Sequence, residues 1–456
     1  MSFLDVLQQI LSTPAILVGL VAFVGLLLQK KPIEDITKGT IKTIVGFLVL
    51  GAGADFLVVS LNAFGALFNF AFGVQGVVPN NEAIVSLALV QFATETSLIM
   101  CFGMLANLVI ARFSRLNYIF LTGHHTLYMA CLLAAVLNAG GLSGWQLILS
   151  GSLVLGFTMA AFPAMAQKTM TKITGNDELG FGHFGTVGYW IAGEIGALTG
   201  KGSKSTEEIK FPQRLSFMRD TTVAIALTML MFFLVVTGIA NYKPGFDTAM
   251  LGGNHWILFA ILKSLTFAGG VYIVLAGVRL VISEIVPAFK GISEKLVPNA
   301  RPALDCPVVF PYAPNAVLIG FLVSFLGGIV GLFVLAGVGM AIPVALILPG
   351  VIPHFFCGAT AGVFANARGG VRGCVIGSFV HGLAITFLPA LLMPVLGALN
   401  FANTTFSDAD FTVVGIALGN IARFIQGYGL VAVCVLIFAL PIILNYTVPK
   451  KEKITQ

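Results

Sequence analysis

The sequence predicts an all-α polytopic integral membrane protein with about 11 transmembrane helices. The 456 residues are 57% hydrophobic and only 10% charged, with a mean hydropathy of +0.98, whereas soluble chains carry about 25% charged residues. Apolar runs long enough to span a bilayer recur along the chain, and the run 316–362 is long enough for two spans. These runs are 14–29, 44–72, 93–111, 117–137, 145–165, 222–240, 255–280, 316–362, 373–399 and 427–446.

Basic residues cluster in short polar segments between the runs, so they predict orientation. If all clusters are cytoplasmic, the spans alternate consistently, the N-terminus faces outward and the C-terminus lies in the cytoplasm. Lys243 and the acidic stretch 408-DAD-410 then fall outside. The net charge of +6 is explained by these loops and gives no indication of nucleic-acid binding. The clusters are Lys30, Lys31, Lys38 and Lys42; Arg112 and Arg115; Lys201, Lys204, Lys210, Arg214 and Arg219; Arg368 and Arg372; and Lys450, Lys451 and Lys453.

No motif indicates catalysis, a metal or a cofactor. The chain has no HExxH, no GxxxxGK[ST] and no carboxylate cluster with metal-ligand spacing. Its six cysteines are scattered singly, without a CxxC pair. We therefore expect no metal, no cofactor and no enzymatic activity of its own. Any pumping must take its energy from an ion gradient or from a partner protein.

The polar segment 200–214 divides the chain into halves that resemble each other weakly. The stretch 121–141 aligns with 348–370 after two residues are inserted, and 78–90 resembles 313–325. On the predicted topology the paired segments cross the bilayer in opposite directions. The sequence thus predicts inverted repeats, which in transporters place the substrate site near the midplane between the halves.

Three Gly- or Pro-interrupted segments are poor as full spans: 180–200, 285–315 and 343–356. Irregular backbone at membrane depth is tolerated where protein or a water-filled cavity satisfies it. We interpret these segments as re-entrant hairpins or broken helices that line a polar site. The alternative is ordinary loops with amphipathic surface helices.

A few polar residues remain inside or beside apolar segments, where they mark a binding site or a helix-to-helix hydrogen bond. His124 and Tyr128 are four residues apart and share a helix face, and Asp305 lies between two prolines. Such a set suits a hydroxyl-rich, anionic or neutral sugar-like substrate. The residues are Asp55, Asn81, Glu82, Glu95, His124, His125, His183, Glu194, Asp305, His354, His381 and Arg423.

The chain resembles the membrane-embedded, ascorbate-specific IIC components of the bacterial sugar phosphotransferase system. The resemblance is carried, in order, by 38-KGTIKTIVGF-47, 121-LTGHH-125, 180-GFGH-183 with Trp190, 304-LDCPVVFPYAPNAV-317 and 349-PGVIPHFFCGATAGVFANARGG-370. It implies a homodimer in the inner membrane, with a V-shaped dimerisation domain and a mobile core domain that has two re-entrant hairpins. It also implies elevator-type transport of L-ascorbate, coupled to phosphorylation by a cytoplasmic IIB protein that is itself supplied by IIA.

The same resemblance implies domain boundaries. The dimerisation helices are 1–75 and 220–283, and the core halves are 76–200 and 284–425. The cytoplasmic linker is 201–219, and a last helix with its tail is 426–456.

The resemblance also implies which residues bind the substrate. His124, His183 and Asp305 fall on binding positions of the family, while the role of His125 stays open. Tyr128 and Phe184 stand where the ascorbate transporter has glutamine, and Asn81 and Glu82 stand where it has threonine and tyrosine. Because half of the hydrogen-bonding shell differs, the alternatives are a IIC permease for another acidic sugar or a polyol, or an ion-coupled secondary transporter. A scaffold or channel is disfavoured by the paired broken segments.

Overall fold

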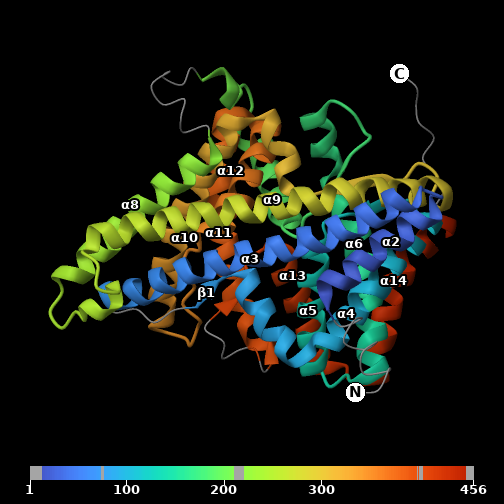
Figure 1. The fold of residues 1–456 in the computed structure, drawn as a ribbon, viewed down its shortest axis with the longest axis horizontal. Coiled ribbons are helices and arrows are strands. Elements are labelled where there is room, and N and C mark those ends of the chain that lie inside the picture. Colours follow the sequence, from blue (N-terminus) through green and yellow to red (C-terminus); the bar gives the residue numbers. More distant parts are fainter. Residues whose placement is uncertain (1–12, 73–76, 210–219, 398, 400–403, 448–456) are drawn as a thin grey trace.

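The computed structural model describes residues 13–72, 77–209, 220–397, 399 and 404–447, and within them the chain is mainly helical (Figure 1). Five short strands interrupt the helices: β1 (Val78–Pro79), β2 (Tyr118–Phe120), β3 (Gly180–Phe181), β4 (Arg301–Leu304) and β5 (Thr404–Thr405). The α-helices are α2 (Pro14–Leu28), α3 (Ile33–Phe72), α4 (Asn81–Phe113), α5 (Gly123–Ala139), α6 (Gly144–Thr174), α7 (Thr186–Thr199), α8 (Thr221–Tyr242), α9 (Trp256–Leu296), α10 (Pro314–Gly339), α11 (Val351–Pro353), α12 (Ala359–Leu392), α13 (Ala409–Phe424) and α14 (Tyr428–Thr447).

Six helical stretches among the described residues are long and apolar enough to cross a membrane. This finding identifies a multi-pass membrane protein, while the predicted number of about 11 spans stays a prediction. The stretches are Thr94–Phe113, Gly144–Thr174, Ile225–Tyr242, Pro314–Gly339, Val351–Val395 and Tyr428–Thr447.

The long helices α3 and α9 lie side by side along the longest axis of the molecule (Figure 1). Helix α8 joins them through an aromatic contact, in which the rings of Phe64 and Phe233 meet edge to face at 5.3 Å. The outer faces of this layer are apolar, since Leu48 and Leu265 are more than half exposed. Such a face suits lipid or another protein rather than water.

The strands join the two halves of the chain in a reciprocal way. Strand β4 of the second half pairs in parallel with β2 and with β3 of the first half. Conversely, β1 of the first half pairs in parallel with β5 of the second, and the neighbouring Val77 bridges to Ile347. Each half therefore contains a strand that crosses to the other half, followed by a long helix. The first half continues with β2 before α5 and β3 before α7, and the second half with the bridge at Ile347 before α11 and β5 before α13.

The three segments predicted to be broken differ in their regularity. The segment 285–315 is irregular only in its second part, because α9 continues to Leu296. Pro298 then prevents continuation, since the residue before a proline disfavours helical geometry. The segment 180–200 contains β3 and the regular helix α7, and 343–356 is irregular up to the short helix α11, which leads into a π-helical turn, His354–Gly358. Re-entrant hairpins stay a prediction.

Candidate functional site

The carboxyl ends of the short strands carry the polar side chains of the site. His124 and His125 follow β2 in the first turn of α5, and His183 follows β3. Asp305 follows β4, and Asp408 follows β5. Neighbouring strands are parallel, so each strand group presents its carboxyl ends on one edge. The reciprocal pairing of the halves thereby brings residues from distant parts of the sequence together.

Five of these side chains form an alternating series that we call the His–Asp row: His124, Asp305, His183, Asp408 and His125. The Nε2 of His124 lies 3.7 Å from Oδ2 of Asp305. The Nε2 of His183 lies 3.9 Å from an oxygen of Asp305 and 3.9 Å from Oδ2 of Asp408. The Nε2 of His125 also lies 3.9 Å from Oδ2 of Asp408.

The spacing of the row leaves a gap between each donor and acceptor. A direct hydrogen bond to oxygen spans about 2.7–3.2 Å, so separations of 3.7–3.9 Å are too long for one. Polar groups at this spacing are commonly bridged by an intervening hydroxyl or water. The His124 side chain is 16% exposed, and the other four are 7% exposed or less. The row is therefore enclosed by protein in this conformation.

Backbone donors determine which nitrogen of two histidines faces the row. The Phe184 N–H donates to Nδ1 of His125 at 3.2 Å, and the Gly185 N–H donates to Nδ1 of His183 at 3.1 Å. A ring nitrogen that accepts a hydrogen bond carries no proton, so the neutral imidazole carries its proton on Nε2. From this network we assign Nε2–H donors to both rings, directed at the carboxylates of the row.

This tautomer makes the cluster a poor metal site. Three groups of side chains have ligand atoms within 4.8 Å of one another, and each group contains His125 or His183. A metal would need the lone pair on Nε2, and a metal-bound histidine normally donates its other N–H to an acceptor. Here the other nitrogen faces a backbone donor instead. The donor set thus suits hydrogen bonds to a ligand better than coordination.

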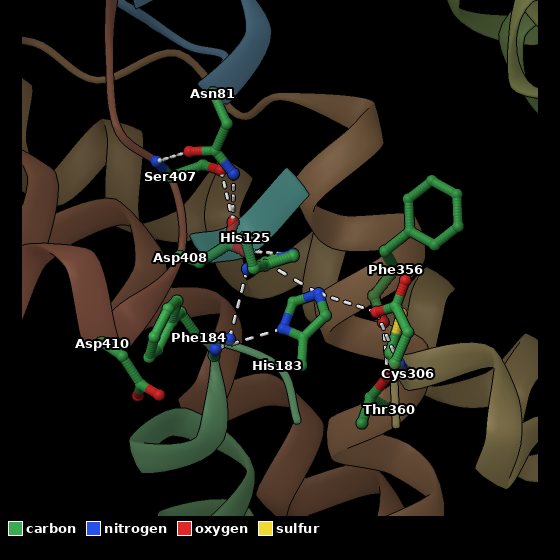
Figure 2. Close-up of polar contacts among 12 residues, drawn as sticks. Asn81, His125, His183, Phe184, Cys306, Phe356, Thr360, Ser407, Asp408 and Asp410 are labelled. Atoms are coloured by element: carbon green, nitrogen blue, oxygen red, sulfur yellow. Dashed lines mark hydrogen bonds and ion pairs between the residues drawn. The ribbon is translucent and has the colours of Figure 1, made fainter. Parts of the chain in front are cut away.

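Asp408 is held in place by two neighbours through one of its oxygens. Its Oδ1 accepts from the Asn81 amide at 2.9 Å and from the Ser407 hydroxyl at 2.5 Å. The Asn81 oxygen in turn accepts from the Ser407 N–H at 2.9 Å. Figure 2 shows this arrangement, with His183 lying between Asp408 and Cys306. The second oxygen, Oδ2, lies 3.9 Å from the Nε2 atoms of both His125 and His183.

Helix N-termini surround the row and favour its negative charge. Helices α4, α5, α7 and α13 all begin within a few residues of it, and the N-terminal end of a helix carries a partial positive charge. Asp410 occupies one such end directly, because its two oxygens accept from the N–H groups of Thr186 and Val187 at 3.0 and 2.7 Å. This bond ties the start of α13 to the start of α7, next to His183.

The remaining predicted residues lie differently around the row. The Tyr128 ring is buried in α5 and packs against His124, at 5.7 Å between centroids. The Phe184 ring is completely buried and stacks on Phe120 at 4.6 Å, so it is mainly the backbone of this residue that faces the row. The side chain of Glu82 lies outside the described residues. A separate open cavity of about 650 Å³, lined by Asn420 and Arg423 among others, includes none of the row.

The predicted topology puts 408-DAD-410 on the outer side of the membrane, which stays a prediction, but its two aspartates are buried inside the protein rather than exposed to water. Asp408 is 3% exposed and Asp410 is completely buried. The charge pattern misleads here because it gives this short acidic stretch a side of the membrane from the location of basic residues elsewhere in the chain. The signal that finds Asp408 is an internal similarity: His183 in 181-FGH-183 and Asp408 in 406-FSD-408 each lie between a short strand, β3 or β5, and the helix that follows it.

Comparison with known proteins identifies the family of the chain. Residues 9–410 match the EIIC-GAT family, described as PTS system sugar-specific permease component. A similar protein is the "Ascorbate-specific PTS system EIIC component" of Mycoplasma pneumoniae, 25% identical over 426 residues that cover 81% of this chain. The match covers 63% of the length of that relative. On the extent of the family match, the chain belongs to the EIIC-GAT family of phosphotransferase-system sugar permease components.

Proposed function

We propose that this protein is the permease subunit that binds and translocates L-ascorbate in a bacterial cytoplasmic membrane. In this proposal it acts as a homodimer by an elevator-type movement, and a cytoplasmic IIB protein, supplied by IIA, phosphorylates the delivered sugar. The observation that carries the proposal is the enclosed His–Asp row between the two halves of the chain. The printed name of the Mycoplasma pneumoniae relative supports ascorbate as the first substrate to test.

The chemistry of the row suits a polyhydroxylated ligand. A hydroxyl group both donates and accepts hydrogen bonds, so it can donate to a carboxylate and accept from a histidine N–H at the same time. Tyr128 adds an aromatic ring beside His124 for contact with an apolar ring face or CH groups. Hydrogen bonds to charged groups contribute about 1.5–3 kcal/mol each, so a few of them suffice for specific binding.

A neutral sugar or polyol is the second candidate, and Asp408 is the observation that favours it. Two carboxylates in one enclosed row attract hydroxyl donors, whereas they repel an anionic oxygen. Ascorbate satisfies the row through its neutral hydroxyl groups, and a neutral polyol does so without any repulsion. Measured affinities for ascorbate and for neutral polyols therefore distinguish the two candidate substrates.

Titration calorimetry on the purified protein tests the site and the substrate together. L-Ascorbate should bind the wild type, and Asp305→Asn and His183→Ala should each weaken binding about 5- to 150-fold because a buried polar group loses its partner. Asp247→Asn and His255→Ala are matched controls, since both residues are exposed and remote from the row. Unchanged affinity in both row variants would remove the site assignment. Binding of polyols in place of ascorbate would establish the second candidate.

Energy coupling separates this permease from an ion-coupled secondary transporter. Uptake should require the IIB protein and phosphoenolpyruvate, and it should survive collapse of the proton and sodium gradients. The chain itself carries no nucleotide-binding motif, which is why the phosphoryl group must come from a partner. Gradient-driven accumulation of unmodified sugar would establish the secondary transporter instead.

Orientation can be tested by single cysteines in a background that lacks the native six. Lys204 is exposed in the segment between the halves, and Thr248 is exposed in the segment between α8 and α9. An impermeant thiol reagent added to intact cells should label Thr248→Cys and spare Lys204→Cys. The reverse pattern would invert the topology.

A further inference from the structure

We infer that Asp408 and His125 form a second recognition subsite for the substrate, equivalent to the one formed by Asp305 and His124, with His183 shared between them. The inference rests on the proposed function, because it concerns the same His–Asp row. It assigns a role to two residues that the family resemblance leaves without one. It also restricts the substrate to molecules with at least two hydroxyl groups placed to reach both carboxylates.

The first argument is that the two oxygens of each carboxylate have different partners. Asp408 uses Oδ1 for the Asn81 amide and the Ser407 hydroxyl, and its Oδ2 faces His125 and His183. Asp305 accepts the Cys306 N–H through Oδ1 at 2.7 Å, and this oxygen also faces His183 at 3.9 Å, whereas its Oδ2 faces His124. In both cases one oxygen fixes the side chain, and the other lies within reach of a histidine without touching it.

The second argument is the absence of direct contact along the row. An ion pair that served only to hold the two halves together would close to hydrogen-bonding distance, about 2.7–2.9 Å for a charged pair. His125 and Asp408 instead remain 3.9 Å apart although both are buried. A bridging hydroxyl can donate to the carboxylate and accept from the Nε2–H, which satisfies both groups.

The third argument is the distance between the subsites. The oxygens of Asp305 and Asp408 that face His183 each lie 3.9 Å from the same Nε2 atom, so they are at most twice 3.9 Å apart. A small sugar or polyol can therefore place one hydroxyl at each carboxylate while a third polar atom meets His183. Because the three histidines belong to the first half of the chain and both carboxylates belong to the second half, the ligand would bridge the two halves.

The experiment measures affinities of wild type, Asp305→Asn and Asp408→Asn for L-ascorbate and for analogues that each lack or methylate one hydroxyl. Asp408→Asn should weaken ascorbate binding about tenfold, as expected for the loss of one charge-assisted hydrogen bond. It should also bind ascorbate and one of the analogues with equal affinity, because that analogue lacks the hydroxyl that contacts Asp408. Asp305→Asn should lose discrimination against a different analogue. Combining each protein variant with each ligand analogue gives a double-mutant cycle, which isolates the contact between one side chain and one hydroxyl group of the ligand.

The matched control is Asp410→Asn, which alters a buried carboxylate two residues away that caps α7 and is not part of the row. It should lower thermal stability and leave the pattern of analogue discrimination unchanged. His125→Gln provides an independent variant in case Asp408→Asn does not fold, and it should lose the same discrimination as Asp408→Asn.

Two outcomes are distinguishable. If ascorbate binds and Asp305→Asn weakens it, but the Asp408 and His125 variants discriminate every analogue as the wild type does, the second subsite is refuted and the proposed function stands. If the wild type ignores ascorbate, the proposed substrate is refuted. The same cycle is then run with the polyol that binds and its deoxy analogues, where retained discrimination in the Asp408 variant overturns the subsite.

Discussion

Replacing Asp410 with alanine should destabilise the protein more than any exposed helix cap does. Asp410 is completely buried, and its oxygens accept from the N–H groups of Thr186 and Val187 at 3.0 and 2.7 Å. The N-cap residue of α7, Gly185, has no side chain that could replace this cap. Asp410→Ala therefore leaves two buried backbone donors without an acceptor.

The magnitude follows from those two donors. Each buried donor without a partner costs about 1–3 kcal/mol, and the carboxylate also loses its favourable interaction with the helix N-terminus, about 0.3–2 kcal/mol. Removal of a buried charge recovers part of its desolvation cost, so the expected loss is about 2–4 kcal/mol rather than the full total. Asp410→Asn keeps one acceptor oxygen and should lose about half as much.

The assay is unfolding in mixed micelles with increasing sodium dodecyl sulfate, followed by intrinsic fluorescence. Asp220→Ala is the matched control, because Asp220 caps α8 through the Val223 N–H at 3.0 Å but is exposed. Water can replace that cap, so the control should lose about 1 kcal/mol or less. If Asp410→Ala is no less stable than Asp220→Ala, the buried cap contributes nothing beyond an ordinary one, and the reasoning fails.

Three further outcomes follow from packing and charge. Gly369→Ala should destabilise the crossing of α7 and α12, because the added Cβ would lie 2.0 Å from a backbone oxygen of α7. Gly337→Ala is the control: its added Cβ would have no atom within 4 Å, so the variant should be neutral or stabilising in the same unfolding assay. Glu194→Gln should cost about 1–2 kcal/mol, because the buried guanidinium of Arg368 loses a charged partner that is itself 37% exposed and screened by solvent, and Arg368→Met in the same chain should restore much of that loss. Phe184→Gln should lower stability by about 3 kcal/mol, because its completely buried ring stacks on an aromatic neighbour; a variant as stable as the wild type would show that the ring can leave the core.

The membrane class and three polar residues of the row could be predicted because both depend on local patterns. Long apolar runs identify helices that need no knowledge of their neighbours, and His124, His183 and Asp305 stand out against such runs. The pairing of the strands could not be predicted in this way. Strands β1, β3 and β5 have two residues each, too few for an alternating pattern. The backbone donors that fix the tautomers of His125 and His183 were equally hidden, since they depend on that pairing.

The error at Asp408 shows how the repeat determines the site. Charge alone assigns an acidic stretch to water, and this rule fails where strand ends from both halves meet in the interior. The pairing of β5 with β1 brings Asp408 into the row. Asn81 at the start of α4 fixes one of its oxygens, and α13 begins at the next residue. His183 then stands between a carboxylate from β4 and a carboxylate from β5, at 3.9 Å from each. A change that loosens either strand pair should therefore alter the spacing of the row and weaken substrate binding. If the proposed function holds, substrate affinity should depend on the contact between the halves as well as on the side chains of the row.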